Sequence, residues 1–151
     1  MWIEELRLGK KIKQFELIAF CLLYDHFHMM VRPNEKENLS EIMRSFKTNF
    51  SRNANRILGI SESEQIKIPQ KLRSRDLNFG KDLGNMIKKH NNKLKNLKTK
   101  FLQKYKSLYK FPIFQWQKSF YDHFIRNDLD YDNHWQYTTY NYLIPLRLQK
   151  L

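Results

Sequence analysis

Cysteine is nearly absent from this sequence, since Cys21 is the only one among 151 residues, and an internal disulfide bond is therefore excluded. It lies in an apolar run, so we expect a buried thiol in a protein of a reducing compartment, the cytoplasm. That run, Leu17 to Tyr24, is the longest apolar stretch and is far too short to span a bilayer. The N-terminus lacks a basic start, an apolar core and a cleavage site, so we expect no signal peptide.

Acidic residues are also scarce, with 15 Asp and Glu against 28 Lys and Arg, which gives a net charge of +13. This excess favours a polyanionic partner, which could be DNA, RNA or an anionic membrane surface. Aromatic residues make up 15% of the chain. Basic and aromatic side chains together suit single-stranded nucleic acid, because phosphates need cations and unstacked bases need flat partners. A lysine-rich genome bias that only solvates the surface explains the composition equally well.

The N-terminal part of the chain predicts a pair of strands. A nearly continuous apolar run over residues 15–23 suits a buried strand, and the alternating residues 26–32 suit a second one. Tyr24 and Asp25 are the expected turn between them. Residues 1–13 are expected to be a short charged lead-in.

Three helices are predicted after the strand pair. Apolar residues recur at helical spacing over residues 39–58 and again over 83–108. The third helix, residues 128–143, begins with acidic residues that complement the helix dipole. Asn38 and Asn127 are the candidate N-caps of the first and third helices, and Gly59 is a candidate stop for the first.

The segments between these helices are predicted as a loop over residues 60–80 and a strand over residues 114–125. Between Leu83 and Phe111 there are nine lysines and no acid. Like charges cost a helix some stability. This lysine-rich helix would therefore be stabilised most by binding to an anionic partner. An ordinary solvated helix is the alternative.

His26 and His28 are the first candidates for chemistry. Residues at i and i+2 of a strand project from the same face, with Cα atoms roughly 6.5–7 Å apart, so two imidazoles can converge on one ion. The intervening Phe27 would turn inward. A packed or surface role remains open for each histidine, and Cys21, His90 and His123 are expected to be structural.

Tyr137 and Asn141 are the second candidates, since a spacing of i, i+4 puts them on one face of the last predicted helix. A tyrosine phenol is a poor nucleophile near neutral pH, because it is almost fully protonated there. It becomes useful where a metal withdraws charge from the target phosphate. The alternative is that the tyrosines of this helix form an aromatic core face.

Four blocks of sequence follow one another in a meaningful order: residues 15–32, FELIAFCLLYDHFHMMVR; residues 39–59, LSEIMRSFKTNFSRNANRILG; residues 115–126, QWQKSFYDHFIR; and residues 127–142, NDLDYDNHWQYTTYNY. They resemble, in turn, the strand pair ending in His-hydrophobic-His, the following helix, the distinctive strand and the tyrosine helix of the single-tyrosine HUH transposases. That family includes the REP-associated and IS200-like transposases.

The resemblance implies that His26, His28 and Asn141 hold a divalent metal, Mg²⁺ or Mn²⁺, and that Tyr137 is the nucleophile. Two imidazoles suit Mn²⁺ better than Mg²⁺, which favours oxygen ligands. It also implies DNA transposition through nicking and rejoining of single-stranded DNA with a hairpin end, by way of a 5′-phosphotyrosine link. The basic residues expected to contact DNA are Arg32, Arg44, Lys47, Arg52, Lys118 and Arg126.

The implied fold class is α+β: a ferredoxin-like antiparallel sheet packed against helices, in one domain over residues 1–151. A loop and a lysine-rich helical insertion over residues 60–113 depart from the family pattern, as does Asn141-Tyr142 where the family has Asn-Pro. A first strand of the family has no counterpart here, which predicts an N-terminally truncated copy. Three alternatives follow: an active enzyme, a relative that binds DNA without cutting it, and a basic remnant. A homodimer is left open.

Overall fold

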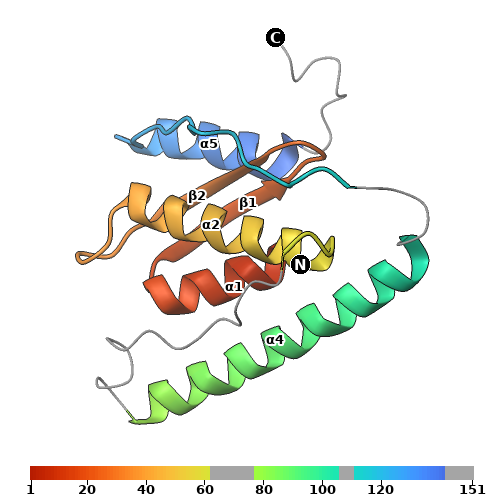
Figure 1. Cartoon of the computed structure of the whole chain (residues 1–151). Helices are drawn as coiled ribbons and strands as arrows, with labels where there is room; N and C mark the ends of the chain where they lie inside the picture. The colour runs from red at the N-terminus through yellow and green to blue at the C-terminus, as the bar shows by residue number, and fades with distance from the viewer. Residues whose placement is uncertain (62–76, 106–110, 142–151) are drawn as a thin grey trace.

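The computed structural model describes residues 1–61, 77–105 and 111–141. In this part of the chain four helices surround a two-stranded antiparallel sheet, which confirms the predicted α+β class. Helices α1 and α2 pack on one face of the sheet and α5 packs on the other, while α4 lies along α1 and α2 (Figure 1). None of the described helices is long and apolar enough to cross a membrane.

Helix α1 (Trp2–Lys13) occupies the segment that was predicted to be a charged lead-in, so that prediction was wrong. Trp2 and Leu6, one turn apart, are both buried and cluster with Phe15, Ile42 and Phe46. The charged residues of α1 cover its other sides, and they masked this narrow apolar stripe in the sequence. The helix contributes a central part of the core.

Strands β1 (Glu16–Leu22) and β2 (Phe27–Arg32) form the predicted antiparallel pair. The Leu23 N–H donates to the His26 carbonyl over 2.9 Å, which closes the turn at the predicted position. Cys21 lies opposite His28, and it is buried as expected. The register shifts between Leu17 and Ala19, so Ile18 is an extra residue in β1, a β-bulge.

The two faces of β2 differ in chemistry. Phe27 packs against Trp2 and Phe46, with ring centroids 5.3 and 5.6 Å away, and so anchors the strand in the core as predicted. His28, the next residue, faces α5, because successive side chains of a strand point to opposite faces.

Helix α2 (Leu39–Ile57) confirms the predicted helix, cap included. The Asn38 side chain accepts a hydrogen bond of 2.8 Å from the Glu41 N–H, and this satisfies one of the free donors at the helix start. Gly59 follows the helix with a φ of 74°, a conformation that glycine adopts at little cost. Ile42 and Phe46 carry the buried face.

Helix α4 (Leu77–Tyr105) begins earlier than predicted, since residues 77–80 were expected to belong to a loop. The rest of that loop, residues 62–76, and the predicted helix end at 106–108 lie outside the described residues. Leu83, Ile87 and Leu94 are buried along one side of the helix. This apolar stripe docks α4 and leaves most of its lysines in solvent.

A cluster of three buried polar residues links three helices beside this stripe. Glu5 of α1 accepts hydrogen bonds from Asn53 Nδ2 of α2 over 2.7 Å and from His90 Nε2 of α4 over 2.9 Å. All three residues are at most 3% exposed. His90 therefore lies in the core, as expected of a structural residue.

Residues 114–125 form no strand, although all of them are described, so the predicted third strand was wrong. Side chains of α2 bind the backbone of this segment instead. The Asn55 amide pairs with both the N–H and the carbonyl of Phe114, at 2.7 and 3.1 Å. Lys47 Nζ donates to the carbonyls of Gln117 and Ser119. The segment therefore runs as an extended but irregular chain beside α5 (Figure 1).

Helix α5 (Asp128–Tyr140) begins as predicted, with the Asn127 side chain accepting a 2.8 Å hydrogen bond from the Asp130 N–H. Its predicted last residues, 142 and 143, lie outside the described residues. Thr138 is the only buried residue of the helix. Asn141, which directly follows the helix, is also buried. The face that α5 presents to the sheet is therefore largely polar.

Candidate metal and tyrosine site

The structure brings Tyr137 of α5 against His28 of β2, with ring centroids 5.0 Å apart and planes at 77°. The His26 and His28 rings are themselves 5.0 Å apart. The two imidazoles therefore stand on the same face, as the strand alternation predicted, and the phenol completes a row of three rings. This row joins the hairpin to a helix that lies far away in the sequence.

The environment of His28 favours a neutral imidazole and leaves one ring nitrogen without a hydrogen bond among the described residues. Its Nε2 atom is buried and has no hydrogen-bond partner among the described residues. Burial lowers the pKa of His28, and the charge on neighbouring His26 lowers it further. The neutral ring is the form that ligates a metal ion.

His26 is held differently. Its Nδ1 atom lies 2.7 Å from the Asp25 carboxylate, and its side chain is 41% exposed. A carboxylate partner on one ring nitrogen fixes the orientation of the ring and makes the other nitrogen a better ligand. The Nε2 atom of His26 is therefore the candidate ligand atom.

Tyr137 and Asn141 lie at the C-terminal end of α5, one turn apart. The tyrosine is 50% exposed, whereas the asparagine is only 1% exposed. The phenol can therefore be reached from solvent while the amide is held inside the protein.

A groove of about 940 Å³ opens at this place and is lined by His26, His28 and Tyr137. Tyr24 and Tyr121 also line it and are 98% and 99% exposed. Exposed flat rings suit unstacked bases.

Three of the predicted DNA contacts already have partners in the chain. Arg32 pairs with Glu16 over 2.8 Å, and Arg44 pairs with Glu41 over 2.6 Å. Lys47 lines the groove, but its ammonium is bound to two backbone carbonyls of the 114–125 segment. Its position fits a structural role better than a free phosphate contact.

The other three predicted contacts, Arg52, Lys118 and Arg126, are exposed. Lys118 and Arg44 both line a second groove. The backbone N–H of Arg126 donates to the Asp130 carboxylate over 3.1 Å, which leaves its side chain to solvent. Of these six residues, Arg32 and Lys47 line the groove that holds the histidine pair, and the other four do not.

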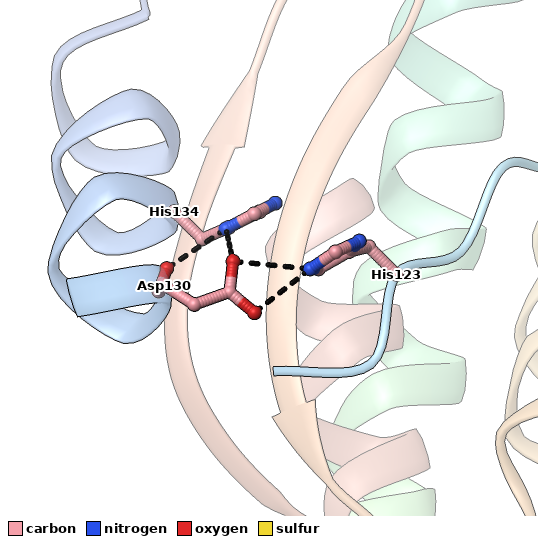
Figure 2. Close-up of side chains that lie close together, drawn as sticks. All are labelled: His123, Asp130 and His134. Carbon is pink, nitrogen blue, oxygen red and sulfur yellow. Dashed lines mark hydrogen bonds and ion pairs between the residues drawn. The ribbon is translucent and has the colours of Figure 1, made fainter. Parts of the chain in front are cut away.

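The sequence interpretation missed a second cluster of metal-ligating side chains, His123, Asp130 and His134 (Figure 2). From the sequence, only a structural role is expected for His123. Its Nε2 atom lies 2.9 and 3.0 Å from the two oxygens of Asp130, and His134 Nδ1 lies 3.0 Å from the same carboxylate. The Asp130 and His134 spacing of i, i+4 was the available signal.

Fold and site together define a basic α+β protein in which a histidine pair on a strand faces a tyrosine on a helix. The family model described as "Transposase IS200 like" matches residues 4–67. Over these residues the chain is similar to the IS200-like transposases. No curated protein and no solved structure matches the chain.

The matched range contains most of α1, both strands and α2, and so includes His26 and His28. Tyr137 and Asn141 lie beyond it. The similarity to the family therefore covers the histidine half of the site, and the tyrosine half depends on the geometry described above.

Proposed function

We propose that this chain nicks and rejoins single-stranded DNA, with Tyr137 as the nucleophile and with His26, His28 and Asn141 holding a divalent metal, Mg²⁺ or Mn²⁺. The contact between the His28 and Tyr137 rings, 5.0 Å between centroids, is the observation that carries the proposal. It supports one reaction centre built from two distant parts of the chain.

The residues present fit a metal ion. The buried Nε2 atom of His28, which has no hydrogen-bond partner among the described residues, is the kind of atom that an ion satisfies. Two imidazole nitrogens and an amide oxygen suit Mn²⁺ better than Mg²⁺. When bound, such an ion would polarise a non-bridging oxygen of the scissile phosphate.

The chain itself supplies the nucleophile. The Tyr137 oxygen forms a bond to phosphorus, and the bond from phosphorus to the 3′ oxygen breaks. The phenol proton is released to solvent, and the leaving oxygen takes up a proton to become a 3′-hydroxyl. The 5′-phosphotyrosine product keeps a phosphodiester bond, so attack by a 3′-hydroxyl rejoins the strand. The half-exposed position of Tyr137 supports this role.

DNA affinity would come mainly from the excess of basic residues. A net charge of +13 favours binding to phosphates through release of counterions, and this makes binding sensitive to salt. The exposed Tyr24 and Tyr121 rings of the groove are positioned to stack on unpaired bases.

A second candidate function is binding of hairpin or single-stranded DNA without cleavage. The range of the family match favours it, because residues 4–67 do not include Tyr137. Both functions would draw DNA affinity from the same excess of basic residues, so only a covalent product separates them.

The test is formation of a covalent adduct with a labelled single-stranded hairpin oligonucleotide in Mn²⁺, read as a shifted band on a denaturing gel. We expect Tyr137→Phe to abolish the adduct. Tyr140→Phe is the matched control, since Tyr140 lies on the same helix and is 49% exposed. We expect His26→Ala to abolish the adduct and to leave salt-sensitive DNA binding in place.

An adduct that persists in Tyr137→Phe would refute the assigned nucleophile. Binding by the parent chain with no adduct in either Mn²⁺ or Mg²⁺ would favour the second function. Equal loss of binding and of adduct in His26→Ala would contradict the division between a metal site and a basic binding surface.

A further inference from the structure

We propose that His123, Asp130 and His134 form a second metal site, separate from the histidine pair, which takes Zn²⁺ or a similar first-row transition ion. The site would tie the 114–125 segment to α5. The proposal depends only on this cluster and would stand if Tyr137 proved not to be a nucleophile.

The three side chains already converge on one point. One ligand atom from each lies within 4.8 Å of the other two. Ligand atoms at 2.0–2.2 Å from a tetrahedral Zn²⁺ lie roughly 3.3–3.6 Å from one another. The His123–Asp130 and His134–Asp130 distances of about 3 Å are slightly shorter than this. Small side-chain rotations would therefore admit an ion between the carboxylate and the two rings.

The donor set has the right chemistry for such an ion. Two imidazole nitrogens and one carboxylate oxygen are a common ligand set for Zn²⁺, with water in the fourth position. Hydrogen bonds from His123 and from the Arg126 backbone lower the pKa of Asp130, so its carboxylate is ionised at neutral pH. The cluster thus offers one carboxylate oxygen and two imidazole nitrogens as donors.

The fold holds these ligands in place from two directions. Asp130 and His134 are one turn apart on α5, so they share a face of the helix. His123 reaches them from the extended segment, and its ring stacks on that of His134 with centroids 4.4 Å apart and planes at 7° (Figure 2). Both the backbone carbonyl and the carboxylate of Asp130 contact His134 Nδ1.

The cluster is open enough to take up an ion from solvent. The side chains of His123 and His134 are 45% and 38% exposed, and that of Asp130 is 20% exposed. An ion here would tie the 114–125 segment to α5, so we assign it a structural role.

The experiment is titration of the full chain with Zn²⁺ alone, measured by calorimetry, with Co²⁺ absorption as a report of ligand geometry. The key variant is His123→Phe, which keeps a ring able to stack on His134 but removes the nitrogen donors. We expect Zn²⁺ binding at this site to weaken by more than about tenfold, because even outer partners of metal sites are worth 10–100-fold. His134→Gln should have the same effect.

Two controls separate this site from its surroundings. Asp132→Asn removes an exposed carboxylate of the same helix that is not in the cluster, and it should leave Zn²⁺ binding unchanged. In a variant with both His26→Gln and His28→Gln, one equivalent of Zn²⁺ should still bind. That equivalent should be lost when His123→Phe is added.

Zn²⁺ affinity unchanged by His123→Phe in the His26→Gln, His28→Gln background would overturn the proposal. The absence of any Zn²⁺ binding in that background would also overturn it, provided that circular dichroism shows the variant to be folded. The cluster would then be a hydrogen-bonded clamp alone. Neither result bears on the covalent adduct of Tyr137, so failure of this proposal and failure of the proposed function can be told apart.

Discussion

The two sides of the strand pair are built from different kinds of contact. On the α1 and α2 side, rings and aliphatic side chains such as Trp2, Phe27 and Phe46 are packed together and buried. On the α5 side, the helix itself buries only Thr138. One side therefore supplies most of the stability, and the other carries the candidate chemistry.

This division has a consequence for motion. Apolar burial contributes about 25 cal/mol per Å², whereas a single hydrogen bond contributes about 0.5–1.5 kcal/mol net. We therefore expect α5 and the 114–125 segment to open locally well before the core side unfolds. The predictions that follow test this ranking, from the largest expected effect to the smallest.

Phe46→Ala should cause the largest loss of stability. Phe46 is 5% exposed and contacts the rings of Trp2 and Phe27. Removing a buried phenylalanine ring costs about 3–5 kcal/mol through lost burial and the cavity that remains. Chemical denaturation followed by circular dichroism measures it. Leu129→Ala on α5, where the side chain is 72% exposed, is the control and should stay within about 0.5 kcal/mol. Similar losses in both variants would refute the contrast.

His90→Ala should have an intermediate effect. It removes one of the two donors to the buried Glu5 carboxylate and leaves that carboxylate with Asn53. A buried polar group that loses a partner costs about 1–3 kcal/mol. The same denaturation experiment measures it, with Lys89→Ala as the exposed neighbour for comparison. If His90→Ala unfolded no more easily than Lys89→Ala, the cluster of Glu5, Asn53 and His90 would not be holding α4 in place.

Lys47→Met should have the smallest effect on global stability. It removes the hydrogen bonds from Lys47 to the Gln117 and Ser119 carbonyls, which are worth about 0.5–1.5 kcal/mol. We expect faster cleavage of the 114–125 segment by a protease, while the denaturation midpoint changes little. Arg52→Met, at an exposed position of the same helix, should leave cleavage unchanged. Cleavage at the parent rate in Lys47→Met would show that other contacts hold the segment.

The parts of the fold that sequence could predict are those with local causes. The hairpin follows from an apolar run, a turn and an alternating stretch, and α2 follows from its apolar spacing and the Asn38 cap. Helix α1 was missed because its apolar stripe is narrow and charged residues surround it. The expected strand over residues 114–125 failed for another reason: a strand needs a pairing partner, and here side chains of α2 take the backbone hydrogen bonds.

The candidate site was predictable to a similar degree. The shared face of His26 and His28 follows from strand geometry alone. The contact of His28 with Tyr137 could not follow from any local pattern, because it depends on how α5 packs, and only the family resemblance pointed to it. The His123 contact with Asp130 was missed because His123 lies in a segment whose path depends on the tertiary structure.

The extra residue in β1 governs which changes in length the hairpin can accept. Leu17 pairs with Val31, and Ala19 pairs with Met30, so Ile18 stands outside the ladder. Deleting Ile18 would leave both pairs intact and yield a regular strand. An insertion or deletion inside β2 would instead exchange the directions of Phe27 and His28, placing an imidazole in the core and a phenyl ring in the groove. Among natural variants of this chain, length changes should therefore be tolerated at the bulge and eliminated in the strand opposite.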